Sequence, residues 1–88
     1  MIQLENVDES VVKIAAAVEH DMDTNLDLKR IYEAFNQLTP DQKDVVIMRF
    51  VEDLSHQEIS TAMDRSEGAV RLLQHRAINT LKDLIKQQ

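Results

Sequence analysis

Four residues that could contact another molecule lie close together near the C-terminal end of the sequence. Gly68, Arg71, Leu72 and His75 fall on one side of an α-helix if each residue advances 100°. An arginine guanidinium is a rigid fork of donors that fits a guanine edge, and an outward leucine fits a thymine methyl. Gly68 disfavours a helix by about 1 kcal/mol relative to alanine, but it leaves room for a phosphate or base edge to approach the backbone. This face therefore predicts recognition by direct contact.

A catalytic set does not accompany this face. The three histidines, His20, His56 and His75, are far apart in the sequence and lack the spacing of metal ligands. The chain has no cysteine, which excludes disulfides and thiolate metal sites, and it has no glycine-rich phosphate loop. The many carboxylates follow the pattern of solvated helix faces. We therefore expect no enzymatic activity, no catalytic residue, no cofactor and no bound metal.

One acidic segment resembles the start of a calcium-binding loop, with Asp21, Asp23, Asn25 and Asp27 at alternate positions. The match fails because the sixth position, which needs glycine, is leucine, and the twelfth, which needs glutamate, is tyrosine. The segment is interpreted as an acidic linker with helix-capping residues.

The elements that must position the contact face are two adjacent helices. Ser55 and Glu58 form a capping box, with Leu54 and Ile59 placed as its hydrophobic staple. This first helix is expected to end near Met63, because the following residue, Asp64, tolerates the left-handed conformation. Ser66 then caps a second, longer helix. A short helix, a tight turn and a long helix predict a helix-turn-helix, whose second helix enters the DNA major groove.

The long helix has an inward face as well as the contact face. Its apolar side is predicted to consist of Val70, Leu73, Ala77, Leu81 and Leu84, and the opposite side continues beyond His75 with Asn79, Lys82 and Lys86. An ordinary amphipathic hairpin with a solvated outer face is the alternative. Two capped helices joined by a short turn, with an outward arginine, favour the DNA-binding interpretation.

Length and charge limit the possible functions. The chain has 88 residues, enough for one small domain, and a net charge of −6, which argues against general binding of nucleic acid. The charge is uneven, since residues 65–88 contain two acids and five bases and are therefore +3. No apolar run is long enough to cross a membrane and no signal peptide is visible, so we expect a cytoplasmic protein without membrane contact.

The spacing of apolar residues also predicts helices in the N-terminal part of the chain. We expect helices over residues 8–20, 25–38 and 40–51, the last one starting with a Thr39 cap and Pro40 at its first position. Val45, Val46, Met48 and Phe50 are assigned to the core, and Arg49 is a candidate for binding a phosphate or a partner's carboxylate. The expected fold is all-α. Residues 27–88 form a small four-helix domain with a C-terminal helix-turn-helix, of the winged-helix-like class without a wing, and residues 1–26 are a linker or an appended helix.

The segment from Asp27 to Ile85 resembles region 4 of a bacterial sigma factor of the extracytoplasmic-function type. The motifs that carry the resemblance are LTPDQ, MRF, LSHQEI and SEGAVR followed by HRA, at the mutual spacings found here. The resemblance implies a domain that binds the −35 promoter element and docks on the flap of the RNA polymerase β subunit. Anti-sigma factors often mask such domains, so an anti-sigma factor is a further expected partner.

The resemblance also implies roles for individual residues. Residues expected to line the major groove are Ser66, Glu67, Gly68, Arg71 and His75, and residues expected to hold phosphates are Ser55, Arg65 and Arg76. Asp64 departs from the family, which commonly has glycine there. A counterpart of region 2, which reads and melts the −10 element, is missing. We therefore expect a fragment or one half of a split factor that cannot initiate transcription alone.

Two other functions remain open from the sequence. A response-regulator helix-turn-helix of the quorum-sensing type has similar LTP and SEGTV-like motifs, but its His-Arg pair follows the valine by three and four residues. Here His75 and Arg76 follow Val70 by five and six residues. The second alternative is a helical interaction module that binds no DNA and uses its acidic N-terminal half. Binding to promoter fragments and to the polymerase flap would separate the three.

Overall fold

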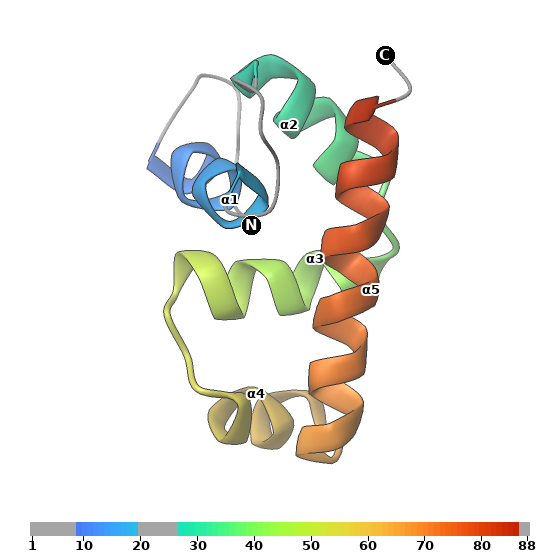
Figure 1. Ribbon diagram of the computed structural model, residues 1–88. Coiled ribbons are helices and arrows are strands. Elements are labelled where there is room, and N and C mark those ends of the chain that lie inside the picture. The colour runs from blue at the N-terminus through green and yellow to red at the C-terminus, as the bar shows by residue number, and fades with distance from the viewer. Residues whose placement is uncertain (1–8, 20–26, 87–88) are drawn as a thin grey trace.

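The computed structural model describes residues 9–19 and 27–86, and within these ranges all regular secondary structure is helical. The five α-helices and one π-helical segment are α1 (Glu9–Glu19), α2 (Leu28–Asn36), α3 (Pro40–Val46), η1 (Ile47–Val51), α4 (His56–Met63) and α5 (Glu67–Lys86) (Figure 1). The all-α prediction is confirmed for this part of the chain. The second helix starts at Leu28 rather than near Asn25, because Asp27 is its N-cap and accepts a hydrogen bond from the Lys29 N–H at 3.0 Å.

Local capping signals form as the sequence predicts. The N–H of Gln42 donates to Thr39 Oγ1 at 3.3 Å, and the N–H of Thr39 donates to Gln42 Oε1 at 3.1 Å. Pro40 occupies the first position of α3, where its missing N–H costs nothing. Each of these groups lies within three residues of its partner, so the contacts need no distant part of the chain.

The third helix ends differently from a regular α-helix. Its last turn, η1, is π-helical, and its C-cap Glu52 donates its N–H to the carbonyl of Ile47 at 2.9 Å. Asp53 then has a positive φ of 63°, which turns the chain toward α4. Arg49, the candidate for a phosphate or a partner's carboxylate, donates from Nη1 to the Leu54 carbonyl at 2.8 Å. This hydrogen bond fixes the loop that leads into the helix-turn-helix.

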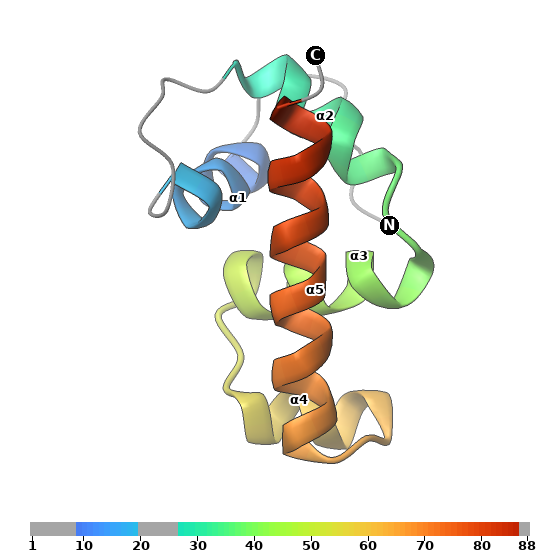
Figure 2. The same cartoon turned by 45° about the vertical axis from the view of Figure 1, so that its right-hand side comes forward.

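Helix α5 runs the length of the molecule and organises the core. In both views α4 lies beside its N-terminal end, while α1 and α2 lie near its C-terminal end (Figures 1 and 2). The buried residues of α5 are Val70, Ala77, Leu81 and Ile85. Of the predicted stripe, Val70, Ala77 and Leu81 are buried, while Leu73 and Leu84 pack against the core but are only half-buried. Ile85, which the prediction did not include, is buried as well. Met48 and Phe50 are also half-buried, whereas Val45 and Val46 are fully buried.

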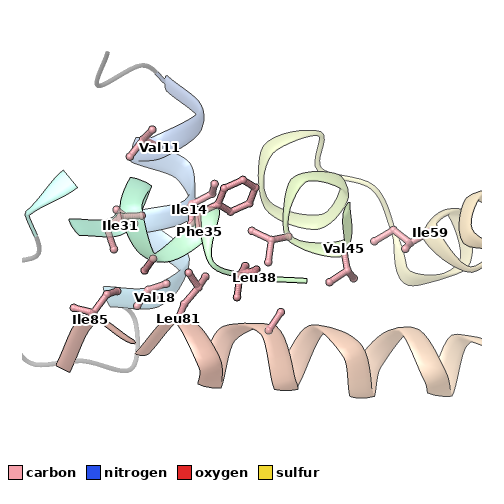
Figure 3. Packing of buried hydrophobic residues seen from close by; sticks show 14 of the residues in the cluster. Val11, Ile14, Val18, Ile31, Phe35, Leu38, Val45, Ile59, Leu81 and Ile85 are labelled. Atoms are coloured by element: carbon pink, nitrogen blue, oxygen red, sulfur yellow. The ribbon is translucent and has the colours of Figure 1, made fainter. Parts of the chain in front are cut away.

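Helix α1 packs into the same core as the rest of the described chain. Val11, Ile14, Ala15 and Val18 are at most 3% exposed (Figure 3). Residues 9–19 form a helix, as the periodicity over residues 8–20 predicts, and its apolar face contacts α2, η1 and α5. Most of the calcium-loop-like segment lies outside the described residues. In the described ranges no group of three or more acidic, histidine or cysteine side chains is placed to hold a metal.

Candidate nucleic-acid interface

Helices α4 and α5 are joined by a tight turn whose geometry follows from three residues. Asp64 is left-handed, with φ 54° and ψ 50°, and its N–H bonds to the last turn of α4. Arg65 donates its N–H to the Ser60 carbonyl at 2.9 Å. The hydroxyl oxygen of Ser66 accepts from the Ala69 N–H at 3.1 Å and caps α5. The aspartate that departs from the usual glycine therefore still forms the turn, and a helix-turn-helix results.

The predicted contact face lies on the N-terminal half of α5 and is exposed. Gly68, Arg71, Leu72 and His75 are all exposed, and Leu72 retains 48% of its surface although it is apolar. A Cβ atom added to Gly68 would meet no atom within 4 Å. Packing among the described residues therefore does not require a glycine at this position.

Two arginines of the predicted site are ion-paired within the chain. Arg71 Nη2 lies 3.5 Å from Glu67 Oε1, one turn earlier on the same face. Arg65 pairs with Asp41 at the start of α3, which links the turn of the helix-turn-helix to a different helix. Both pairs are about half exposed, so solvent screens them and each holds its guanidinium weakly. Asp41 was not among the predicted residues, because it lies 24 positions away in the sequence.

Ser55 begins α4 and is occupied by the capping box. Its hydroxyl oxygen accepts from the Glu58 N–H at 3.0 Å, and its own N–H donates to Glu58 Oε1 at 2.9 Å. The hydrogen bonds from the Ser55 backbone and side chain lower the pKa of the Glu58 carboxyl below its ordinary value of 4.5.

Two hydrogen-bonded pairs of polar side chains lie on or beside the contact face. His56 Nε2 and Gln74 Oε1 are 2.7 Å apart and connect α4 to α5, and His75 Nε2 is 3.1 Å from Asn79 Nδ2. An open hollow of about 420 Å³ adjoins both pairs and is lined by Ala17, Phe50, His56, Arg71, Gln74, His75 and Ile78. Its apolar side is formed by α1, η1 and α5. Sequence reasoning missed His56 and Gln74 because their contact depends on the crossing of α4 over α5.

The structure brings five of the nine predicted residues onto consecutive turns of one face, namely Glu67, Gly68, Arg71, Leu72 and His75. Ser66 caps the same helix, and Arg65 lies in the turn before it. Arg76 is exposed on the flank of this face, one residue beyond His75. Ser55 stands apart, at the start of α4. The arrangement presents a guanidinium, an apolar side chain and an imidazole together, with further polar groups around them.

Comparison with known families gives one match across most of the chain. The profile of "Sigma-70, region 4" matches residues 28–81, which run from the start of α2 to Leu81 in α5. The whole helix-turn-helix and all nine predicted site residues fall within this range. No solved structure matches the chain.

Individual relatives are longer proteins. The chain is 35% identical over 75 residues to ECF RNA polymerase sigma factor SigX of Bacillus subtilis, covering 85% of this chain and 36% of the relative. It is 38% identical over 55 residues to ECF RNA polymerase sigma factor BldN of Streptomyces coelicolor, a match that covers 62% of this chain and 21% of the relative. It is 35% identical over 71 residues to RNA polymerase sigma factor CarQ of Myxococcus xanthus, a match that covers 81% of this chain and 40% of the relative. The chain thus spans well under half the length of these relatives.

Proposed function

The chain belongs to the Sigma-70 region 4 family, with sigma factors of the ECF type among its homologues, and from this premise we propose that it binds the −35 element of bacterial promoters. In this role it acts in the cytoplasm and helps to direct RNA polymerase to those promoters. The observation that carries the proposal is the exposed face of Gly68, Arg71, Leu72 and His75 on the second helix of a capped helix-turn-helix. Such a face can enter the major groove, where base edges are distinguishable.

The roles of the individual residues follow from their positions. Arg71 contacts a base edge, and Leu72 contacts a thymine methyl. Ser66, Glu67, Gly68 and His75 line the groove around them, and the phosphate contacts are made by Ser55, Arg65 and Arg76. Binding exchanges the Arg65–Asp41 and Arg71–Glu67 pairs for contacts with DNA. These exchanges reduce the binding free energy that each arginine contributes, because its ion pair within the chain is lost when its contact with DNA forms.

DNA binding by the chain alone is expected to be weak. The excess positive charge is confined to residues 65–88, while residues 1–40 contain eight acids and three bases and repel phosphate. With roughly three to five phosphates neutralised, the logarithm of affinity should fall with the logarithm of salt concentration at a slope of about −3 to −5. A second contact with RNA polymerase, at the flap of its β subunit, raises the effective concentration at the promoter.

An anti-sigma factor is part of the proposal as a regulatory partner. A protein that covers the recognition face prevents DNA binding without disturbing the fold, because that face contributes little to the core. Leu72 supports this role, since an exposed leucine between polar neighbours offers an apolar contact to a protein as well as to DNA.

The test is selection of bound sequences from a random duplex library, followed by titration of the selected duplex. Selection is carried out with core RNA polymerase present, and the titration with the chain alone and with the chain fused to a β-flap fragment. We expect a preferred motif of a few base pairs, weak binding by the chain alone and tighter binding by the fusion. Nanomolar binding by the chain alone at physiological salt would contradict the proposal and indicate a self-sufficient regulator instead.

A further inference from the structure

The hollow beside the contact face has the size of a small-molecule site. Its volume of about 420 Å³ lies within the range of roughly 300–1,000 Å³ that ligand pockets occupy. Four elements form its wall, since Ala17 comes from α1, Phe50 from η1 and His56 from α4, and the other described lining residues come from α5. Its shape is therefore set by the packing of the fold rather than by one side chain.

The lining of the hollow is apolar in one part and polar in the other. The apolar part consists of Ala17, Phe50 and Ile78, and the polar part consists of His56, Arg71, Gln74 and His75. The described lining residues include no aspartate or glutamate, although the whole chain has 16 acidic residues against 10 lysines and arginines. In so acidic a protein, a hollow of this composition is the complement of an anion with an apolar body.

The hydrogen bonds of the polar part determine which groups are donors. An amide oxygen can only accept, so His56 Nε2 donates to Gln74 Oε1 at 2.7 Å, and the amide nitrogen of Gln74 carries two N–H donors. Asn79 Nδ2 can only donate, so His75 Nε2 accepts from it at 3.1 Å, and the proton of the neutral ring is on Nδ1. Together with the Arg71 guanidinium, three side chains of the hollow thus supply N–H donors.

We propose that the hollow binds a small aromatic carboxylate. The ring packs on Phe50 and Ile78, and the carboxylate accepts hydrogen bonds from Arg71 and Gln74. Arg71 is the permanently charged member of the described lining, so a single negative charge is matched better than the double charge of a phosphate. Its ion pair with Glu67, at 3.5 Å, is about half exposed and weak enough to be exchanged.

A bound carboxylate competes with DNA, and this consequence rests on the proposed function. Arg71 and His75 belong both to the hollow and to the contact face, so neither can serve the carboxylate and the DNA at the same time. Because coupling between two ligands is reciprocal, the carboxylate lowers affinity for DNA by the factor by which DNA lowers affinity for the carboxylate. The hollow is thus a site at which a small molecule regulates promoter binding.

Three probes test the site in the full chain, in titrations followed by backbone amide NMR shifts. The compound 2-naphthoate has both the ring and the charge, 2-naphthamide keeps the ring without the charge, and acetate keeps the charge without the ring. We expect 2-naphthoate to bind at least about tenfold more tightly than either control, with the largest shifts at the residues that line the hollow. Equal affinity for 2-naphthoate and 2-naphthamide, or shifts concentrated elsewhere, would overturn the inference.

A matched pair of variants locates the carboxylate. Gln74→Glu places a negative charge in the hollow and keeps an oxygen that accepts from His56, so the link between α4 and α5 remains. Gln57→Glu adds the same charge at an exposed position of α4 that is not among the described lining residues. Gln74→Glu should weaken 2-naphthoate binding by about tenfold or more, and Gln57→Glu by less than about twofold. Equal effects of the two variants, with both folded in thermal melts, would overturn the inference.

Titration of the selected duplex at constant ionic strength tests the link to DNA. Saturating 2-naphthoate should weaken duplex binding by about tenfold or more, while the same concentration of acetate should leave it unchanged. Unchanged duplex affinity with the hollow occupied would overturn regulation by the ligand. Duplex binding without any binding of 2-naphthoate would overturn the inference and leave the proposed function intact, whereas 2-naphthoate binding without duplex binding would support the site and overturn the proposed function.

Discussion

The N-terminal half of α5 exposes Gly68, Arg71, Leu72 and His75, whereas the C-terminal half buries Leu81 and Ile85 in the core shared with α1 and α2. Figure 3 shows Leu81 and Ile85 close to Val18 of α1. The first half is shaped by local hydrogen bonds, in the caps and turn around it. The second half depends on apolar contacts between segments that are distant in the sequence.

The difference between the two halves separates recognition from stability along a single helix. A side chain on the exposed face of the N-terminal half, such as Leu72, can change without a cavity forming, because few atoms pack against it. A side chain on the buried half cannot, because a protein core is close-packed and relaxes only in part around a deletion. Substitutions on the buried half should therefore change the free energy of unfolding, whereas substitutions on the exposed face should change DNA binding.

The largest expected effect is on stability, from Leu81→Ala. Leu81 is fully buried, so truncation should lower the free energy of unfolding by roughly 2–5 kcal/mol. This is a large fraction of the stability of a small domain, which is about 5–15 kcal/mol. Leu72→Ala is the matched change on the exposed half and should alter stability by less than about 0.5 kcal/mol. Urea titrations of both variants measure this, and a larger loss for Leu72→Ala would show that the helix is rotated from its described orientation.

A smaller effect is expected on DNA recognition, from Arg71→Ala. Loss of a bidentate contact to a base should reduce discrimination between sequences by about 1–3 kcal/mol and leave thermal stability almost unchanged. Arg76→Ala should weaken binding to all sequences alike and reduce the salt slope by about 1, as expected for a phosphate contact. Lys86→Ala, at the far end of α5, is the charge-matched control. If Arg71→Ala and Arg76→Ala behaved identically, the assignment of Arg71 to a base would be wrong.

Gly68→Ala should raise the stability of the fold but lower the affinity for DNA. Space is available for the added methyl group, and alanine favours a helix, so the free energy of unfolding should rise by up to about 1 kcal/mol. Affinity for the selected duplex should fall, because the methyl group keeps the DNA away from the backbone. Thermal melts and duplex titrations on the same sample measure both quantities. Unchanged DNA affinity would mean that no phosphate or base edge approaches Gly68.

The smallest effect concerns the pH dependence of the Ser55–Glu58 capping box. Since the folded pKa of Glu58 lies below its ordinary value of 4.5, the stability contributed by its ionised form is complete above that value. It is lost as the pH falls through the folded pKa. Glu58→Gln can keep the box, since glutamine also serves at this position, and it should remove this part of the acid sensitivity. Urea titrations between pH 3 and pH 7 test this, with Glu52→Gln as the control for loss of one exposed acid, and equal acid sensitivity in both variants would exclude the effect.

The local structure and the exposed face of α5 follow from the sequence alone. The capping boxes at Thr39 and Ser55 and the left-handed Asp64 could be predicted because each involves groups within a few residues of one another. The exposed face of α5 could be predicted from helical periodicity, and its motifs were sufficient to indicate the family, which the match over residues 28–81 confirms.

How these elements pack on one another depends on the tertiary structure. Ile85 is buried more deeply than Leu84 because α5 packs against different helices along its length, α4 near its start, then α3, and α1 and α2 near its end. The pairing of Asp41 with Arg65 and the position of α1 over α2 and η1 depend on helix crossings between distant segments. Periodicity identifies the side of a helix that is buried, but it does not specify which helix covers it.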